Sequence, residues 1–302
     1  MNKILLLGAN GQVGWELQRS LAPLGELVVC DRQRGNLANL AGLAALVERE
    51  RPSVIVNAGA YTAVDKAESD VDSARRVNAE AVAVLAATAR ELGAWLVHYS
   101  TDYVFDGSGS TPFEEDAATD PLGAYGQTKL EGELAIRESG CRHLIFRTSW
   151  VYAVRGGNFA KTMLRLAKER DELKVVADQI GAPTSAELIA DITALVLSRL
   201  QHDAALAERA SGTYHLVTSG ETSWHRYAQY VISEAQRLGS ELRTSRERIH
   251  PIASSDYPVP AKRPANSRLN NDKLQRTFGV SLPHWEYHVQ RMIRELVETE
   301  AV

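Results

Sequence analysis

Cysteine, long apolar runs and blocks of like charge are all scarce in this sequence of 302 residues. Its two cysteines, Cys30 and Cys141, lie far apart, which is typical of reduced thiols in a cytoplasmic protein. The apolar run at the start ends at Gly8, too early for a signal peptide, and no other stretch approaches a membrane span. The net charge is −4 without a Lys/Arg-rich run, so we expect neither nucleic acid nor a membrane as partner.

Strand-like and helix-like patterns alternate over the first half of the chain. The apolar runs fall at 3–7, 26–31, 53–62, 95–100 and 143–152. This alternation predicts an α/β fold: a Rossmann-type doubly wound parallel sheet with a smaller C-terminal α/β substrate-binding lobe. The expected division is a dinucleotide-binding domain over 1–152 plus about 184–218, and a substrate lobe over about 153–183 and 219–302.

Three glycines mark the first junction between a strand and a helix: Gly8, Gly11 and Gly14. The early ones allow a tight turn and close approach of a ligand to the backbone, and the last allows close helix packing. The helix N-terminus would then face a pyrophosphate. The next strand ends at Asp31, whose carboxylate can accept hydrogen bonds from an adenosine ribose. We therefore favour a dinucleotide site over a generic glycine turn.

Tyr125 and Lys129 are the strongest candidates for chemistry. Four residues apart on a helix, they project from one face and can act on the same small volume. A phenol is a slow acid–base group at neutral pH, and an adjacent ammonium would lower its pKa. A buried strand ends nearby in the sequence at Ser100, Thr101 and Asp102. These residues together predict a site of proton transfer.

Two further side chains have two interpretations each. Asn78, in a long amphipathic helix, is either a buried polar brace or a reactive group, and the brace is favoured. Trp150, at the end of an apolar strand, either packs in the core or forms a wall of the pocket. Its place at a strand end favours the pocket.

With the motifs GANGQVG, YSTDYVF and YGQTK, the chain resembles the extended short-chain dehydrogenase/reductases over its whole length. The resemblance implies that Tyr125 donates a proton, that Lys129 lowers its pKa and holds the nicotinamide ribose, and that Thr101 hydrogen-bonds to the substrate carbonyl. The expected cofactor-binding residues are Gly8, Asn10, Gly11, Gln12, Val13, Gly14, Asp31, Arg32, Asn36, Leu37, Ala58, Gly59, Ala60, Tyr61, Thr62, Tyr125 and Lys129.

Longer motifs, among them FRTSWVY, DQIGAPT and RPANSRL, resemble members of that family that act on dTDP-linked keto sugars. The implied reaction is reduction of the 4-keto group of dTDP-6-deoxy-L-lyxo-4-hexulose by NAD(P)H, giving dTDP-L-rhamnose. Arg263 is the candidate for the substrate pyrophosphate, with solvated surface charge as the alternative. The expected substrate residues are Thr101, Asp102, Tyr125, Trp150, Asn158, Lys161, Arg263 and Asn266.

Asp31 and Arg32 favour different cofactors. The carboxylate of Asp31 suits the free 2′-hydroxyl of NADH, whereas Arg32 can pair with the 2′-phosphate of NADPH. Asn36 is neutral where the family usually has an acidic residue, which reduces the local negative charge. We therefore expect both NADPH and NADH to be used.

Two other functions fit parts of the sequence. One is a nucleotide-sugar epimerase or dehydratase of the same fold, but dehydration needs an added acid and base, and this chain has Tyr103 after Asp102 where relatives have a glutamate. The other is a non-catalytic regulatory subunit that binds a dinucleotide. The intact Tyr125 and Lys129 favour an enzyme over that alternative.

Glu187 and Asp191 share one face of a helix that starts near Ser185. A solvated acidic face is the simpler interpretation. In a homodimer, which we expect, two such faces meeting across a two-fold axis would offer oxygen ligands to a divalent cation such as Mg²⁺. The sequence thus raises a metal site as a second, separate hypothesis.

Overall fold

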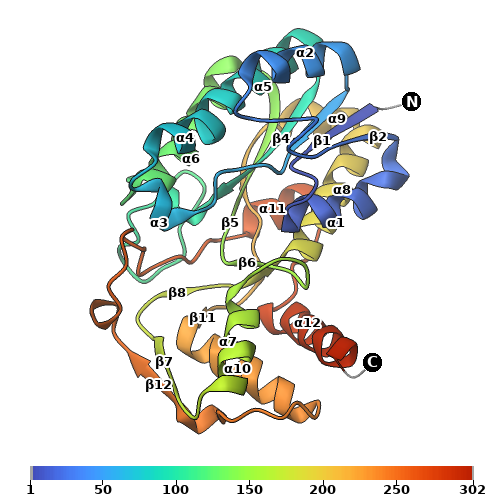
Figure 1. Cartoon of the computed structure of the whole chain (residues 1–302). Coiled ribbons are helices and arrows are strands. Elements are labelled where there is room, and N and C mark those ends of the chain that lie inside the picture. Colours follow the sequence, from blue (N-terminus) through green and yellow to red (C-terminus); the bar gives the residue numbers. More distant parts are fainter. Residues whose placement is uncertain (1–2, 301–302) are drawn as a thin grey trace.

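A six-stranded parallel sheet organises the structure, a computed structural model that describes residues 3–300. The strand order is β10-β5-β4-β3-β1-β2, and every neighbouring pair is parallel (Figure 1). The strands are β1 (Lys3–Leu7), β2 (Glu26–Cys30), β3 (Val54–Asn57), β4 (Trp95–Thr101), β5 (Arg142–Thr148) and β10 (Gly212–His215). The prediction of a Rossmann-type doubly wound sheet is confirmed.

Helices cover both faces of this sheet because its strands are apolar on both sides. Ile4 and Leu6 of β1 pack in one core with α1 (Gln12–Leu21) and α8 (Ala186–His202). Leu5 and Leu7 point the other way, into a second core that also contains residues of three further helices. The helices on that side are α2 (Leu40–Glu50), α5 (Ala81–Leu92) and α6 (Ala124–Ser139). The remaining helical segments of this region are α3 (Val64–Ala67), α4 (Val71–Arg75), a π-helix (Arg76–Glu80) and α9 (Ala204–Arg209).

The other strands form three two-stranded sheets, packed with α7 (Phe159–Glu169), α10 (Trp224–Arg237) and α12 (Trp285–Glu300) in the lower half of Figure 1. These strands are β6 (Val151–Tyr152), β7 (Leu173–Val176), β8 (Ile180–Gly181), β9 (Thr184–Ser185), β11 (Thr222–Ser223) and β12 (Ile249–Ile252). Among residues 3–300, no helix is long and apolar enough to cross a bilayer.

One helix of the C-terminal region lies apart from the expected substrate lobe. α11 (Asp272–Phe278) packs against β10, and its Leu274 and Phe278 belong to the core that α1 and α8 share with the large sheet. The two-domain division stays a prediction. The packing nevertheless places this part of the range 219–302 with the dinucleotide-binding half.

The sequence predicts a single strand over the apolar run 143–152, but the structure has two strands there. β5 ends at Thr148 and β6 begins at Val151, and between them Trp150 has φ 47°, in the left-handed region that bulky residues rarely adopt. Such a conformation costs about 1–3 kcal/mol and persists only where the surroundings enforce it. The break turns the chain at the carboxyl end of β5, where the candidate site lies.

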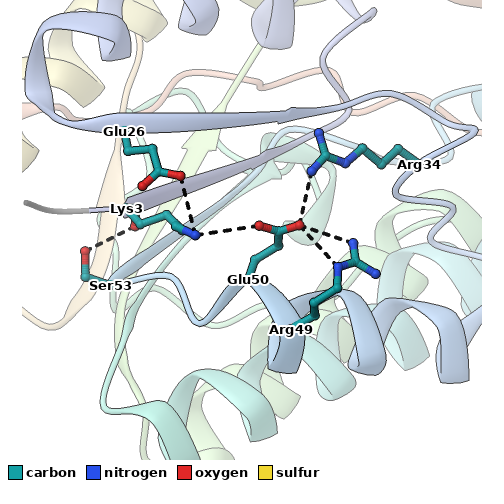
Figure 2. Close-up of polar contacts among 6 residues, drawn as sticks. All are labelled: Lys3, Glu26, Arg34, Arg49, Glu50 and Ser53. Atoms are coloured by element: carbon teal, nitrogen blue, oxygen red, sulfur yellow. Dashed lines mark hydrogen bonds and ion pairs between the residues drawn. The ribbon is translucent and has the colours of Figure 1, made fainter.

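An ion-pair network ties the first two strands to the end of α2 (Figure 2). Lys3 Nζ lies 3.4 Å from Glu26 and 3.8 Å from Glu50. The Glu50 carboxylate also accepts hydrogen bonds from Arg34 at 3.1 Å and from Arg49 at 3.2 Å. Pairs this close to solvent contribute little to stability. The network instead fixes the position of one side chain, because Glu50 holds Arg34 in the turn that follows β2.

Candidate active site

A cavity of about 700 Å³ lies beyond the carboxyl ends of β1, β3, β4 and β5. Ligands of open α/β sheets bind in this crevice. It brings together the predicted residues Gly8, Asn10, Gly11, Gln12, Val13, Arg32, Asn36, Leu37, Ala58, Gly59, Ala60, Tyr61, Thr62, Thr101, Asp102, Tyr125, Lys129 and Trp150. Gly14, Asp31, Asn158, Lys161, Arg263 and Asn266 were predicted as site residues and do not line it.

The glycine turn has the close backbone packing that its sequence predicts. Gly8 has φ 75°, and a Cβ there would come within 2.4 Å of the Gly59 backbone nitrogen. A Cβ on Gly14 would lie 2.1 Å from the Gly8 carbonyl oxygen, so Gly14 serves helix packing. Gly11 caps α1 without a side-chain hydrogen bond, which leaves the first N–H groups of that helix facing the cavity. The Oε1 atom of Gln12 is buried without a partner among the described residues. The close backbone packing and the free N–H groups fit a dinucleotide pyrophosphate, whereas the Gln12 oxygen is an acceptor and needs a donor instead.

The charged residues in the turn after β2 have different roles. One oxygen of Asp31 accepts the backbone N–H groups of Gln33 and Arg34, both at 3.0 Å, so this carboxylate is partly used in holding the turn. Arg32 lines the cavity, whereas Glu50 holds Arg34. Of the two neighbouring arginines, Arg32 is therefore the one placed to meet a ligand.

Thr101, Asp102 and Tyr125 meet at the base of the cavity. Thr101 Oγ1 donates to Asp102 Oδ1 at 3.0 Å, and it also hydrogen-bonds to Tyr125. Burial raises the pKa of Asp102 to about 6, and the Thr101 hydrogen bond opposes that shift. Burial also raises the pKa of Tyr125 to about 12, with the same hydroxyl acting against it. Our expectation that an adjacent cation lowers the pKa of Tyr125 does not describe this arrangement.

Lys129 is buried and held by strand β4. Its Nζ donates to the Tyr99 carbonyl oxygen at 2.6 Å and lies 3.1 Å from His98 Nε2. Burial lowers the pKa of Lys129 to about 8, and the charge of Glu133 opposes this shift. Sequence reasoning missed His98. A single histidine inside the apolar run WLVHYS was the signal that could have revealed it.

Trp150 forms one wall of the cavity. Its ring stacks on Trp224 with a centroid distance of 3.6 Å and an interplanar angle of 14°. A Cβ on Gly181 would lie 2.8 Å from this ring, so only glycine fits beside it. The pocket interpretation of Trp150 is therefore correct. Asn78 is the predicted polar brace, because its Oδ1 accepts the Tyr61 N–H at 2.8 Å and its Nδ2 donates to Thr128 Oγ1.

Three predicted substrate residues have other tasks in the structure, and we correct them. Asn158 caps α7 by accepting the N–H of Lys161 at 3.1 Å, and Lys161 Nζ donates to the Val154 carbonyl at 2.8 Å. The amide of Asn266 donates to the carbonyls of Ser108 and Thr111. Each side chain thus bonds to backbone groups, and none of the three lines the cavity.

The two carboxylates suggested for a metal are paired with arginines. Glu187 lies 3.2 Å from Arg291, and Asp191 accepts hydrogen bonds from Arg19 at 2.9 Å and Ser20 at 2.6 Å. No group of three or more ligating side chains gathers within residues 3–300. The Mg²⁺ hypothesis gains no support from this geometry.

Comparisons with known proteins show the family of this chain. The family model described as "RmlD substrate binding domain" matches residues 1–298. A protein of Shigella flexneri named dTDP-4-dehydrorhamnose reductase is 53% identical over 303 residues, covering 99% of each chain. One of the same name from Salmonella typhimurium is 52% identical, again over 99% of both chains.

Solved structures match equally well. A dTDP-4-dehydrorhamnose reductase of Clostridium acetobutylicum, 36% identical, superposes with a TM-score of 0.87 and covers 99% of this chain and 100% of its own. One from Bacillus anthracis, in complex with NADP, is 33% identical, has a TM-score of 0.86 and covers 97% and 99%.

The doubly wound sheet, the glycine turn and the Thr101–Tyr125–Lys129 cluster define an NAD(P)H-dependent oxidoreductase of the extended short-chain dehydrogenase/reductase class. Within that class, the chain belongs to the RmlD family, whose curated members named above are dTDP-4-dehydrorhamnose reductases.

Proposed function

We propose that this protein reduces the 4-keto group of dTDP-6-deoxy-L-lyxo-4-hexulose with NADPH or NADH, giving dTDP-L-rhamnose. One observation carries the proposal: Thr101, Tyr125 and Lys129 line the same cavity as the glycine turn of the dinucleotide site. A carbonyl placed between them would meet hydrogen-bond donors and a proton source together.

The mechanism assigns each side chain a task. A bound nicotinamide would supply hydride to the keto carbon. Thr101 turns its one hydroxyl hydrogen from Asp102 to the carbonyl oxygen, and Tyr125 gives its proton to the alkoxide that develops there. A phenol with a pKa of about 12 keeps its proton at neutral pH, which suits a donor. Lys129 supplies the positive charge that stabilises the phenolate left behind.

The reaction is tested by mixing the protein with the 4-keto sugar nucleotide, or with its epimerase-generated precursor, and following the loss of reduced nicotinamide. The product should match dTDP-L-rhamnose in mass and chromatography. Oxidation of cofactor without that product, or no oxidation at all, would reject the assignment.

Dehydration by the same scaffold is disfavoured by Tyr103. Burial raises the pKa of this phenol further above its ordinary value, so it stays protonated at the place where a dehydratase needs a base. Loss of water from the substrate in the same assay is therefore not expected.

Arg32→Ala is expected to raise the KM for NADPH about 10-fold or more and to leave the KM for NADH within about twofold, because only NADPH carries the 2′-phosphate. Steady-state kinetics with each cofactor measures this. Arg34→Ala is the matched control, since Glu50 already holds Arg34, and should leave both values unchanged. An equal effect of Arg32→Ala on the two cofactors would place Arg32 away from the 2′ position.

Arg263 remains our candidate for the substrate pyrophosphate. Its Nη2 lies 3.0 Å from Asp65 Oδ2, its Nε is buried without a partner among the described residues, and its charge acts on Tyr103 of the cavity wall. A guanidinium that binds a carboxylate can bind a pyrophosphate through the same paired N–H groups.

Arg263→Ala should raise the KM for the nucleotide sugar about 10–100-fold with little change in kcat, as expected for the loss of charge-assisted hydrogen bonds that ground and transition state share. Arg243→Ala is the control, because this arginine pairs with Asp171 on the exposed surface at 2.9 Å and does not line the cavity. A fall in kcat at unchanged KM would argue against a phosphate contact.

A homodimer is our proposal for the assembly. Trp15, Leu195 and Tyr287 are 45%, 51% and 64% exposed on α1, α8 and α12, and the Arg291–Glu187 pair joins the last two helices. Large apolar side chains gathered on one surface are typical of an interface. Sizing with and without a chelator tests it: a monomer in both conditions contradicts the dimer, and a dimer that persists with chelator excludes a bridging metal.

A further inference from the structure

A chain of three buried polar side chains runs beneath the cavity, from β3 through β4 to α6. Asn57, His98 and Lys129 are each 1% exposed. Asn57 Nδ2 lies 3.2 Å from His98 Nδ1, and Lys129 Nζ lies 3.1 Å from His98 Nε2. Both ring nitrogens of His98 therefore face a nitrogen atom. Since a neutral imidazole has one N–H, the placement of that hydrogen follows from the neighbours.

The amide of Asn57 fixes the tautomer of His98. The backbone N–H of Gly59 donates to Asn57 Oδ1 at 3.2 Å, so the amide oxygen must lie on that side and the NH₂ group must point to the ring. Asn57 thus donates to Nδ1, which carries no hydrogen. Burial lowers the pKa of His98 well below its ordinary value, so the ring is neutral and its hydrogen is on Nε2.

The fixed tautomer determines which form of Lys129 fits. The Nε2–H group of His98 points at Nζ, where a neutral amine can accept it with its lone pair. An ammonium has no lone pair and would set two N–H groups against each other. The Tyr99 carbonyl takes one amine hydrogen at 2.6 Å. For an ammonium to fit, His98 must carry its hydrogen on Nδ1 and Asn57 must turn its oxygen to the ring, which breaks the bond from Gly59.

The charges around this chain do not cancel its effect. On α6, Glu133 favours the ammonium of Lys129, but Arg147 of β5 binds that carboxylate at 2.7 Å. Across the cavity, Asp102 has a pKa of about 6, so above that pH it is a carboxylate, which the Thr101 hydroxyl binds, and Tyr125 stays protonated.

We propose that His98, oriented by Asn57, is a positioning residue that keeps Lys129 a neutral amine in the cofactor-free protein at mildly alkaline pH and there couples nicotinamide binding to the uptake of one proton. Net, one proton comes from solvent: Lys129 becomes an ammonium, and His98 moves its hydrogen from Nε2 to Nδ1. The inference rests on the proposed function, which requires a positive charge beside Tyr125 at the moment of proton transfer.

The first test reads the tautomer directly. Nitrogen-15 NMR of histidine-labelled wild-type protein at about pH 9, above the pKa of about 8 of Lys129, should show His98 without cofactor neutral with its hydrogen on Nε2, and saturating NADPH should move it to Nδ1. A hydrogen on Nδ1 before NADPH is added, or no change afterwards, overturns the proposal. No variant has to fold for this measurement, and no keto sugar is used.

The second test follows the Kd of NADPH against pH. Because the bound form takes up a proton, affinity should be constant below a pH of about 8 and weaken towards tenfold per pH unit above it. In His98→Gln the amide oxygen can accept from an ammonium, so the weakening should begin at least one pH unit higher. In Asn57→Asp the carboxylate can accept from the Nδ1–H group of His98, so the pH at which NADPH affinity begins to weaken should also rise.

His215→Gln is the matched control. It removes another fully buried histidine of the same sheet, which bonds the Asn270 carbonyl. This variant should keep the wild-type pH curve even if it lowers stability. Superposable curves for His98→Gln and wild type would reject the coupling. Failure to reduce the keto sugar would reject the proposed function and leave both of these measurements intact.

Discussion

Tyr125→Phe is expected to lower kcat for keto-sugar reduction by about 10²–10⁴-fold and to leave the Kd of NADPH within about twofold. The change removes only the hydroxyl that Thr101 binds at the base of the cavity. Hydride transfer would then leave an alkoxide with no proton donor in reach. Single-turnover kinetics and cofactor fluorescence measure the two quantities separately.

A second tyrosine provides the control for that experiment. Tyr152 has a buried hydroxyl without a hydrogen-bond partner among residues 3–299, and it does not line the cavity. Tyr152→Phe removes the same atom and should leave kcat within about twofold. Wild-type-like turnover by Tyr125→Phe would mean that the proton comes from another group, and the mechanism would have to be abandoned.

The sheet and the glycine turn could be predicted because their signals are local. An apolar run followed by Gly8, Gly11 and Gly14 has few ways to pack, and both faces of the strand must be covered. The strand end at Thr101 and the helix that carries Tyr125 were predictable for the same reason. Their meeting in one cavity follows from the parallel order of β4 and β5.

The parts that sequence reasoning missed depend on tertiary contacts. No glycine marks the turn at Trp150, whose left-handed backbone is enforced by stacking on Trp224, a residue far along the chain. Asn158 carries the polarity expected of a sugar contact, yet its position at the start of α7 makes it a helix cap. The role of Trp150 thus depends on a residue remote in the sequence, and that of Asn158 on a local interaction, the capping of α7, that competes with a ligand contact.

The Tyr125–Lys129 pair shows how burial changes a prediction based on charge. On a solvated helix, an ammonium four residues away would stabilise the phenolate. In the structure, burial raises the pKa of the phenol and lowers that of the amine, and the amine bonds to β4. The spacing of Tyr125 and Lys129 predicts that both face one cavity, and both line it. Their protonation states, however, depend on desolvation and on His98.

A buried ion pair holds β5 to the helix that carries these residues. Arg147 and Glu133 are 1% and 0% exposed in their side chains and form two hydrogen bonds, at 2.9 and 2.7 Å. Glu133 also accepts the Ser100 hydroxyl at 2.6 Å, and the Arg147 guanidinium lies 5.0 Å from the centre of the Phe105 ring. The pair therefore joins β4, β5 and α6 directly behind Thr101.

Arg147→Met is expected to lower the free energy of unfolding by about 3–5 kcal/mol, because it leaves the buried Glu133 carboxylate with only the half-exposed Arg137 and the Ser100 hydroxyl as partners. Urea denaturation at neutral pH measures the loss. The matched control is Arg243→Met, which breaks an exposed pair with Asp171 at 2.9 Å and should cost no more than about 1 kcal/mol.

The pH dependence of the free energy of unfolding provides a second test of that prediction. Arg147 and Ser100 hold the pKa of Glu133 below its ordinary value of 4.5 despite burial. In the wild type, this group contributes stability above pH 4.5 that is lost as the pH falls through its depressed pKa. In Arg147→Met the carboxyl should instead prefer its protonated form, so the difference between the two proteins should narrow as the pH falls below that range. A loss of less than about 1 kcal/mol at neutral pH, equal to that of the surface control, would show that the buried pair does not stabilise the site.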